Sequence, residues 1–176
     1  MKKVLQRRLT KIKLLCTDVD GVLTDGGMYY GEDGVEQKKF STRDGMGLTL
    51  LRIAGIITSI ITSEQTKIVK LRADKLKIKN LYQGVHRKMD VLDKIRKHYA
   101  LEWDEIAYIG DDINDLEVLG KVGFAATPSD GCKWNKQLAH YVTERRGGDG
   151  CVREICDLIL EAQHLDNKIF QLYKKG

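Results

Sequence analysis

Four nearly continuous apolar runs constrain the fold of this chain more than any other feature of its sequence. They lie at residues 12–18, 56–62, 106–110 and 122–126, and none shows the strict polar and apolar alternation of a half-exposed strand. Strands that are buried on both faces have this composition, and such strands belong to parallel sheets covered by helices. The sequence therefore predicts a parallel central sheet.

Segments with the apolar spacing of helices separate these runs, at residues 47–55, 64–78, 88–101 and 112–121. The alternation of strand and helix predicts an α/β fold, with a doubly wound parallel sheet and helices on both of its faces. Residues 27–40 interrupt the alternation with two short β runs around the turn GEDG, which predicts a projecting β-hairpin. Residues from about 150 to 173 predict one long amphipathic helix.

Length and composition favour a single domain over residues 1–176. The chain is 42% hydrophobic, which is enough for one substantial core, and we find no linker, repeat or low-complexity tract. The formal net charge of +5 is mild and gathers at the two ends of the chain, which argues against nucleic acid as a partner. A solvated basic surface is the simpler explanation for those terminal lysines and arginines.

The sequence also indicates a cytoplasmic protein. Arginines and lysines interrupt the apolar residues at the N-terminus before a signal peptide could form, and no window reaches the roughly 18 apolar residues of a membrane span. The four cysteines form no C-x-x-C pair, and Cys16 lies within an apolar run. A reducing compartment fits this usage best.

Acidic residues follow two of the predicted strands. Asp18 ends the run at 12–18 and Asp20 follows it, and Asp111 and Asp112 come after the run at 106–110. Ligands of open parallel sheets bind beyond the carboxyl ends of the strands, so these carboxylates converge if the two strands are close neighbours. Their repulsion then requires a cation, and a set of oxygen ligands suits Mg²⁺.

The acidic stretch DVDGVLTDGG could also be a calcium loop or a set of caps and turns. An EF-hand calcium loop would require an oxygen ligand at Val22 and a glycine at Leu23, and the sequence has neither. Carboxylates also cap helices and stabilise turns. A turn is the better explanation for Asp25 because Gly26 and Gly27 follow it.

A magnesium ion beside a free carboxylate suggests phosphoryl transfer, in which aspartate serves as a nucleophile. Asp18 would attack phosphorus, and Asp20 would protonate the leaving group and later deprotonate the attacking water. Thr62 ends a strand with a hydroxyl at the same edge of the sheet. Lys88 begins a helix, where its charge opposes the macrodipole, so we expect it to contact an anion. A solvated surface position is the competing explanation for Lys88.

These residues together resemble the haloacid dehalogenase superfamily of aspartate-nucleophile phosphatases. DVDGVLTDG, Thr62, Lys88 and GDDIND match its four motifs in order, and the resemblance covers nearly the whole chain. It implies a Rossmann-like sheet and an aspartyl-phosphate at Asp18. It also implies that Asp20 binds the metal through its backbone carbonyl, that Asp111 is the third metal ligand, and that Asp112 and Asp115 support the ligands.

Within this superfamily, the small hairpin in place of a cap domain and the segments FSTRDGMGL, LYQG and RRGGDGCVREICDLILEAQ are similar to the 3-deoxy-D-manno-octulosonate 8-phosphate phosphatases. That family forms homotetramers in which the hairpins pack together and a neighbour's C-terminal segment closes the active site. The resemblance implies a sugar acid phosphate as substrate, bound by Asp20, Ser41, Thr42, Arg43, Asp44, Gly45, Arg72 and Lys88. Surface ion pairs are the competing explanation for Arg43 and Arg72.

Two positions depart from the octulosonate pattern. The chain has ITSE, with Glu64, where that family has ITGR, and it has Thr49 where the family tends to have arginine. Glu64 together with Lys75 is similar to the phosphatases of nonulosonate 9-phosphates, although Glu64 could equally be a first-turn acid that favours its helix. We favour the octulosonate substrate because the C-terminal third matches it. A broad phosphatase of small esters and a non-catalytic oligomerisation module are the two competing hypotheses from different functional classes.

Overall fold

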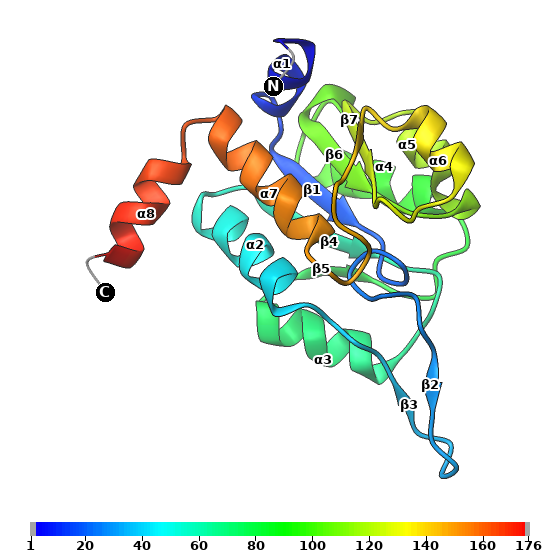
Figure 1. The fold of residues 1–176 in the computed structure, drawn as a ribbon. Helices are drawn as coiled ribbons and strands as arrows, with labels where there is room; N and C mark the ends of the chain where they lie inside the picture. Colours follow the sequence, from blue (N-terminus) through cyan, green and yellow to red (C-terminus); the bar gives the residue numbers. More distant parts are fainter. Residues whose placement is uncertain (1–2, 175–176) are drawn as a thin grey trace.

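A six-stranded sheet, in which every neighbouring pair of strands is parallel, forms the centre of the molecule (Figure 1). The computed structural model describes residues 3–174, and the strands run in the order β5-β4-β1-β6-β7-β8. Their bounds are β1 (Leu14–Thr17), β4 (Ile57–Ile61), β5 (Asn80–Tyr82), β6 (Ile106–Ile109), β7 (Phe124–Thr127) and β8 (Tyr141–Val142). The four apolar runs form β1, β4, β6 and β7, so the predicted parallel sheet is confirmed.

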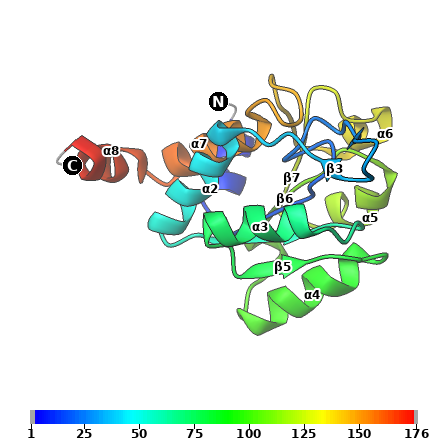
Figure 2. The same cartoon turned by 90° about the horizontal axis from the view of Figure 1, so that it is seen from below.

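Helices cover both faces of this sheet. One face is buried against α1 (Lys3–Leu9), α2 (Thr42–Ile53), α3 (Lys67–Leu76) and α7 (Cys151–Ala162), and the other against α4 (Lys88–His98) and α5 (Leu116–Leu119). Figure 2 shows α4 on the side of β5 opposite to α2 and α7. The short elements η1 (Trp103–Glu105), η2 (Ile113–Asp115) and α6 (Lys133–Leu138) lie in the connections around β6 and β7. The doubly wound α/β architecture is thus confirmed.

The strands bury alternate side chains in two separate cores, which explains their unbroken apolar sequences. Leu15 and Ile60 pack with α2 and α7, whereas Cys16 and Ile61 pack with α4. The residues of β1, β6 and β7 are buried whichever face they point to, and this burial is the main stabilising contribution to such a sheet.

The predicted hairpin is present as β2 (Tyr29–Tyr30) and β3 (Glu36–Gln37), paired antiparallel and projecting from the body (Figure 1). Its base is joined to the loop that follows β1 by an antiparallel bridge between Thr24 and Phe40. The hairpin is therefore anchored beside the carboxyl end of the central strand.

The C-terminal segment forms two helices where the sequence predicted one over residues 150–173. α7 ends at Ala162 and α8 (Asp166–Lys174) follows. His164 adopts a left-handed conformation with φ of 56°, and the N–H of Leu165 donates to the carbonyl of Leu160 at 2.9 Å. This is a Schellman motif, which ends a helix without glycine when the following apolar residue packs back on it. The single-helix prediction was wrong at this point.

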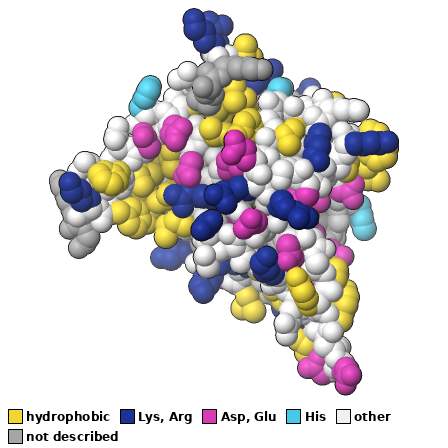
Figure 3. Space-filling view, viewed as in Figure 1, with side chains coloured by type: hydrophobic (Ala, Val, Ile, Leu, Met, Phe, Trp, Pro, Cys, Tyr) yellow, Lys and Arg dark blue, Asp and Glu magenta, His cyan; other side chains and the backbone are white. Residues whose placement is uncertain are grey.

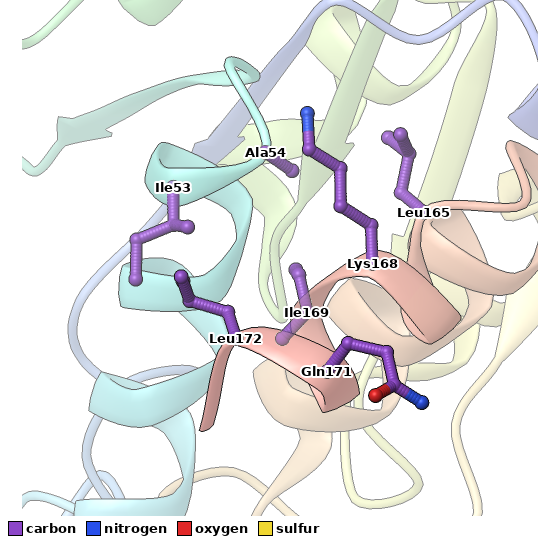
Figure 4. A pocket seen from close by; sticks show the side chains of 7 residues that line it. All are labelled: Ile53, Ala54, Leu165, Lys168, Ile169, Gln171 and Leu172. Carbon is purple, nitrogen blue, oxygen red and sulfur yellow. The ribbon is translucent and has the colours of Figure 1, made fainter. Parts of the chain in front are cut away.

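α8 returns toward the C-terminal end of α2 and leaves a shallow apolar hollow of about 240 Å³ between the two helices (Figure 4). Ile53 and Leu165 line it together with Ile169 and Leu172 of α8. Among residues 3–174, no helix is both long enough and apolar enough to cross a bilayer.

Candidate active site

The candidate site lies at the carboxyl edge of the three neighbouring strands β4, β1 and β6. Asp18 follows the last residue of β1, and its N–H donates to the carbonyl of Ile109 in β6 at 3.0 Å. The carboxylate accepts a hydrogen bond from the N–H of Val19 at 2.6 Å through Oδ1, and only 5% of the residue is exposed. The sheet therefore fixes Asp18 with one carboxylate oxygen held by the backbone.

Lys88 reaches this carboxylate from the first residue of α4. Its Nζ lies 2.5 Å from Oδ2 of Asp18 and 2.7 Å from Oδ1 of Asp115, and 2% of the residue is exposed. Burial opposes the charge, but Asp18 and Asp115 outweigh it and raise the pKa of Lys88. A lysine buried between two carboxylates stays charged, so the predicted contact of Lys88 with an anion is present in the fold itself.

Asp115 holds the loop GDDIND in place through hydrogen bonds of its carboxylate. It is fully buried, its Oδ1 also accepts from the hydroxyl of Tyr108 at 2.6 Å, and its Oδ2 accepts from the N–H of Asp111 at 3.0 Å. A side chain at Gly110 would place its Cβ 2.3 Å from the Asp115 carboxyl carbon, so only glycine fits there. The exposed Asp112 caps the short helix η2 through the N–H of Ile113.

Carboxylate oxygens of Asp18, Asp111 and Asp115 lie within 4.8 Å of one another. Burial, followed by the charges of Asp18, Asp115 and Asp112, raises the pKa of Asp111 to about 8. Burial and Asp115 likewise raise the pKa of Asp18. Ionised carboxylates this close repel one another, and a bound divalent cation offsets the repulsion. Mg²⁺ prefers oxygen ligands, so the donor set fits this ion.

The predicted metal ligands were Asp18, Asp111 and the backbone carbonyl of Asp20, whereas the acidic group of the structure contains Asp115 as its third side chain. Asp115 is already occupied by Lys88, Tyr108 and backbone donors. It therefore fits the supporting role expected for it. Gly21 packs directly on Asp111, since a Cβ at this position would lie 2.0 Å from Oδ2 of Asp111.

Asp20 lies at the rim of the site, with 30% of its side chain exposed. Its Oδ1 is 2.6 Å from Nζ of Lys38, a residue just beyond β3 that the sequence did not single out. A lysine near the end of a predicted hairpin gives no local signal of such a contact. Only the bridge between the hairpin base and the loop after β1 brings the two side chains together.

Thr62 directly follows β4 at the same edge of the sheet, where the sequence predicted it as the last residue of the strand, and it is 1% exposed. Its N–H donates to the carbonyl of Tyr82 at 3.0 Å, and its hydroxyl accepts from the N–H of Glu64 at 3.4 Å. The next residue, Ser63, accepts a hydrogen bond from Asn114 at 3.3 Å. The loops after β4 and β6 are therefore joined around the carboxylates.

The stretch from Ser41 to Gly45 forms the start of α2. Ser41 is the N-cap and accepts from the N–H groups of Arg43 and Asp44, while Thr42 and Arg43 are exposed. Arg72 donates to the carbonyl of Ser41 at 2.8 Å. Gly45 packs on Arg72, since a Cβ there would lie 2.4 Å from Nη2. These residues gather with each other, and the structure shows no contact between them and the acidic group.

The carboxylate of Asp44 caps another helix. It is 1% exposed, and its carboxylate accepts from the N–H of Gly150 at 3.2 Å and from the N–H of Arg153 at 2.8 Å, at the start of α7. Burial raises the pKa of Asp44 despite these donors. Its contacts are those of a structural cap and not of a group open to substrate.

Glu64 and Lys75 are both exposed, and their side chains are not in contact within one chain. Glu64 precedes α3, and Lys75 lies in its last turn. At 1.5 Å of rise per residue, the first residue of this helix and Lys75 are about 12 Å apart along the axis. Glu64 instead faces Lys38, with 4.0 Å between its Oε2 and the Lys38 Nζ.

The glycine-rich loop before α7 packs on the loop after β1. The N–H of Gly148 donates to the carbonyl of Val22 at 2.9 Å, and a Cβ at Gly147 would lie 1.9 Å from the carbonyl oxygen of Gly21. Lys and Arg side chains gather over α2 and α7 nearby (Figure 3). Arg43, Arg145 and Arg153 line a polar hollow of about 540 Å³ together with Glu154, Asp157 and Glu161, so basic and acidic side chains balance there.

Comparison with known proteins agrees with this geometry. The family model of the haloacid dehalogenase-like hydrolases matches residues 55–155. The 3-deoxy-D-manno-octulosonate 8-phosphate phosphatase of Yersinia pestis is 41% identical over 157 residues, which cover 89% of this chain and 84% of that protein. The corresponding protein of Escherichia coli K12 is 41% identical over 152 residues, covering 86% and 81%.

A solved structure extends the agreement to the whole fold. The 3-deoxy-D-manno-octulosonate 8-phosphate phosphatase of Moraxella catarrhalis, in complex with magnesium, phosphate and KDO, superposes with a TM-score of 0.94 at 38% identity. The match covers 98% of this chain and 99% of that chain. The chain therefore belongs to the haloacid dehalogenase-like hydrolases and, within them, to the family of the 3-deoxy-D-manno-octulosonate 8-phosphate phosphatases.

Proposed function

We propose that this protein is a Mg²⁺-dependent phosphatase that hydrolyses 3-deoxy-D-manno-octulosonate 8-phosphate to the free sugar acid and phosphate. The observation that carries the proposal is the buried Asp18–Lys88 pair, 2.5 Å apart, beside the crowded carboxylate of Asp111. Such a nucleophile, a cation for the phosphoryl oxygens and a set of metal ligands are what an aspartate-based phosphatase requires. Relatives with this activity are 41% identical over most of the chain.

Asp18, Asp111 and the backbone carbonyl of Asp20 would hold the metal. When bound, Mg²⁺ neutralises charge among the carboxylates and on the phosphoryl oxygens. A carboxylate oxygen of Asp18 attacks phosphorus, and the bond from phosphorus to the sugar oxygen breaks. Asp20 gives its proton to that oxygen, so the sugar acid leaves as the alcohol.

The second step reverses the role of Asp20. Its carboxylate takes a proton from water, the water oxygen attacks phosphorus, and the bond from Asp18 to phosphorus breaks to release phosphate. Lys88 and Thr62 would contact the phosphoryl oxygens through both steps, since both lie at the same strand edge as Asp18.

The substrate test is a comparison of specificity constants for the eight-carbon and nine-carbon sugar acid phosphates. We expect a clear preference for octulosonate 8-phosphate, with Asp18→Asn as the inactive blank. A preference for a nonulosonate 9-phosphate would instead make Glu64 and Lys75 the determinants of specificity. Equal rates on many small phosphate esters would indicate a broad phosphatase.

We also propose that the protein is a homotetramer in which a neighbouring subunit completes the site. The hairpin exposes the apolar side chains of Met28, Tyr29, Tyr30 and Val35, and such a patch on a projecting element suits a protein interface. Arg72 and Lys75, which do not reach the acidic group of their own chain, would then serve the site of a neighbour. The four cysteines are free, which is consistent with a reducing cytoplasm.

A further inference from the structure

We propose that Lys38 is a positioning residue that holds the carboxyl group of Asp20 where it can give its proton to the leaving group and later take one from water. The inference rests on the proposed function, since it assigns a partner to the acid of that reaction. Nζ of Lys38 lies 2.6 Å from Oδ1 of Asp20, and the lysine side chain has no exposed surface. Asp20 would otherwise be a partly exposed carboxylate, with the Thr24 hydroxyl as its other side-chain partner at 3.4 Å.

The hairpin brings Lys38 to this place. The bridge between Thr24 and Phe40 joins the base of the hairpin to the loop that carries Asp20, and Lys38 lies two residues before Phe40. The Thr24 hydroxyl also accepts hydrogen bonds from the N–H groups of Gly21 and Gly26, both at 3.3 Å. Lys38 and Asp20 therefore come from two segments that are tied together by backbone contacts, which gives the ion pair a defined geometry.

Three carboxylates surround the Lys38 ammonium. Besides Asp20, Oε1 of Glu36 lies at 3.4 Å and Oε2 of Glu64 at 4.0 Å. Oε1 of Glu36 is buried without a hydrogen-bond partner in the described structure, so the ammonium is its compensating charge. Burial opposes the charge on Lys38, but these acids outweigh it and raise the pKa of the lysine.

The two lysines of the site thus form ion pairs with different aspartates. Lys88 pairs with Asp18 and Asp115, and Lys38 is the residue that the described structure pairs with Asp20. Glu36 and Glu64 contact the same ammonium and help to hold it in place. A held carboxylate needs no reorganisation when the proton is transferred, whereas a free one must be oriented in each turnover.

This role predicts a dependence on the leaving group. A sugar alkoxide must be protonated as it departs, whereas p-nitrophenolate leaves without a proton. Lys38→Met should therefore lower kcat/KM on octulosonate 8-phosphate, which reports the steps up to departure of the sugar, by more than about tenfold, a part of the full effect of a general acid. On p-nitrophenyl phosphate kcat/KM should stay within about twofold of the wild type, although kcat can fall on both substrates because Asp20 is also the base in the shared second step.

The experiment measures kcat and KM for both substrates in four proteins: the wild type, Lys38→Met, Lys38→Arg and Lys39→Met. Lys39 is the adjacent control, because its side chain is 62% exposed and pairs with Asp25. We expect Lys39→Met to match the wild type and Lys38→Arg to recover part of the lost rate. Circular dichroism and the thermal midpoint show whether each variant is folded.

Three results would overturn the inference. Equal losses of kcat/KM on both substrates would indicate a general effect on the fold or on phosphate binding, and an increase confined to KM would indicate a substrate contact. Unchanged kcat and kcat/KM on octulosonate 8-phosphate in Lys38→Met would remove the lysine from the reaction. Failure of the proposed function would look different, because the wild type itself would then not hydrolyse octulosonate 8-phosphate.

Discussion

Lys88 shows how a single side chain joins the parts of the candidate site. It begins α4 on one side of the sheet and contacts acids that follow β1 and β6. The sequence pointed to it because a lysine at a helix start opposes the macrodipole. The partner acid Asp115 was expected only in a supporting role, and the structure shows what it supports, namely Lys88 and the Asp111 backbone.

Replacement of Lys88 by alanine tests this arrangement. The variant leaves Asp18 and Asp115 buried without their cation and removes a donor to the phosphoryl oxygens. We expect kcat for phosphate release to fall by about 10²-fold or more. Lys97→Ala, an exposed position on the same helix, is the control and should stay within about twofold. Full activity in Lys88→Ala would remove this lysine from the site.

Lys38 marks the limit of residue-level prediction. Asp18, Thr62, Lys88 and Asp111 each follow or begin an element whose sequence is strongly patterned, so their common location could be predicted. Lys38 depends on a contact between a hairpin and a loop 18 residues away from it, and no periodicity encodes that contact. Asp44 differs in the opposite way. Its place in a matching motif predicted a contact with the substrate, whereas its carboxylate caps α7.

At the scale of elements, the long patterned segments were predictable, and so was the hairpin, because a turn marks its centre. β5, β8, α1 and α6 were missed, since strands of two or three residues and helices of six or seven carry too little pattern to recognise. α2 begins at Thr42, five residues before the predicted start, because Ser41 caps it. The break between α7 and α8 was missed because His164 takes the left-handed position that glycine usually fills.

The cap formed by Asp44 across two helices gives a prediction at this scale. Asp44→Ala removes the acceptor for two N–H groups at the start of α7 and should lower the free energy of unfolding by about 1–2 kcal/mol. Denaturant unfolding measures this, with Asp149→Ala in the adjacent loop as the control. KM should stay unchanged in Asp44→Ala. A raised KM with full stability would restore Asp44 to the substrate-binding residues.

At the scale of the whole molecule, the crowded acids link metal binding to stability and pH. The pKa of Asp111 rises from 3.8 in the unfolded chain to about 8 in the fold. The folded state without metal then binds more protons between these values, so the free energy of unfolding falls as pH rises from about 4 to 8. Denaturant unfolding in EDTA should show this decline.

Saturating Mg²⁺ should remove much of the decline, because the metal stabilises the deprotonated carboxylates. Asp111→Asn should flatten the curve in EDTA and lose most of the stabilisation by Mg²⁺. An unchanged pH dependence in Asp111→Asn would show that the acidic group does not carry the effect.

The assembly is a second property of the whole molecule. The tetramer proposal predicts a mass in light scattering of four times the 20.0 kDa of one chain. Tyr30→Asp, at a position that is 67% exposed in the single chain, should shift the protein to smaller species by placing a charge in the hairpin interface. Val4→Asp, at a similarly exposed apolar residue on α1, is the control. A monomeric wild type would contradict the neighbour-completed site.

The most direct test of the proposed mechanism is to trap the phosphoryl group on the enzyme. Octulosonate 8-phosphate labelled at phosphorus is mixed with the protein and Mg²⁺, quenched in acid within milliseconds, and the labelled peptide is identified. We predict a hydroxylamine-labile label on Asp18, slower to form in Asp20→Asn because the departing sugar then lacks its acid, and neither label nor phosphate release in Asp18→Asn. A label on another residue, or substantial phosphate release by Asp18→Asn, would contradict the mechanism.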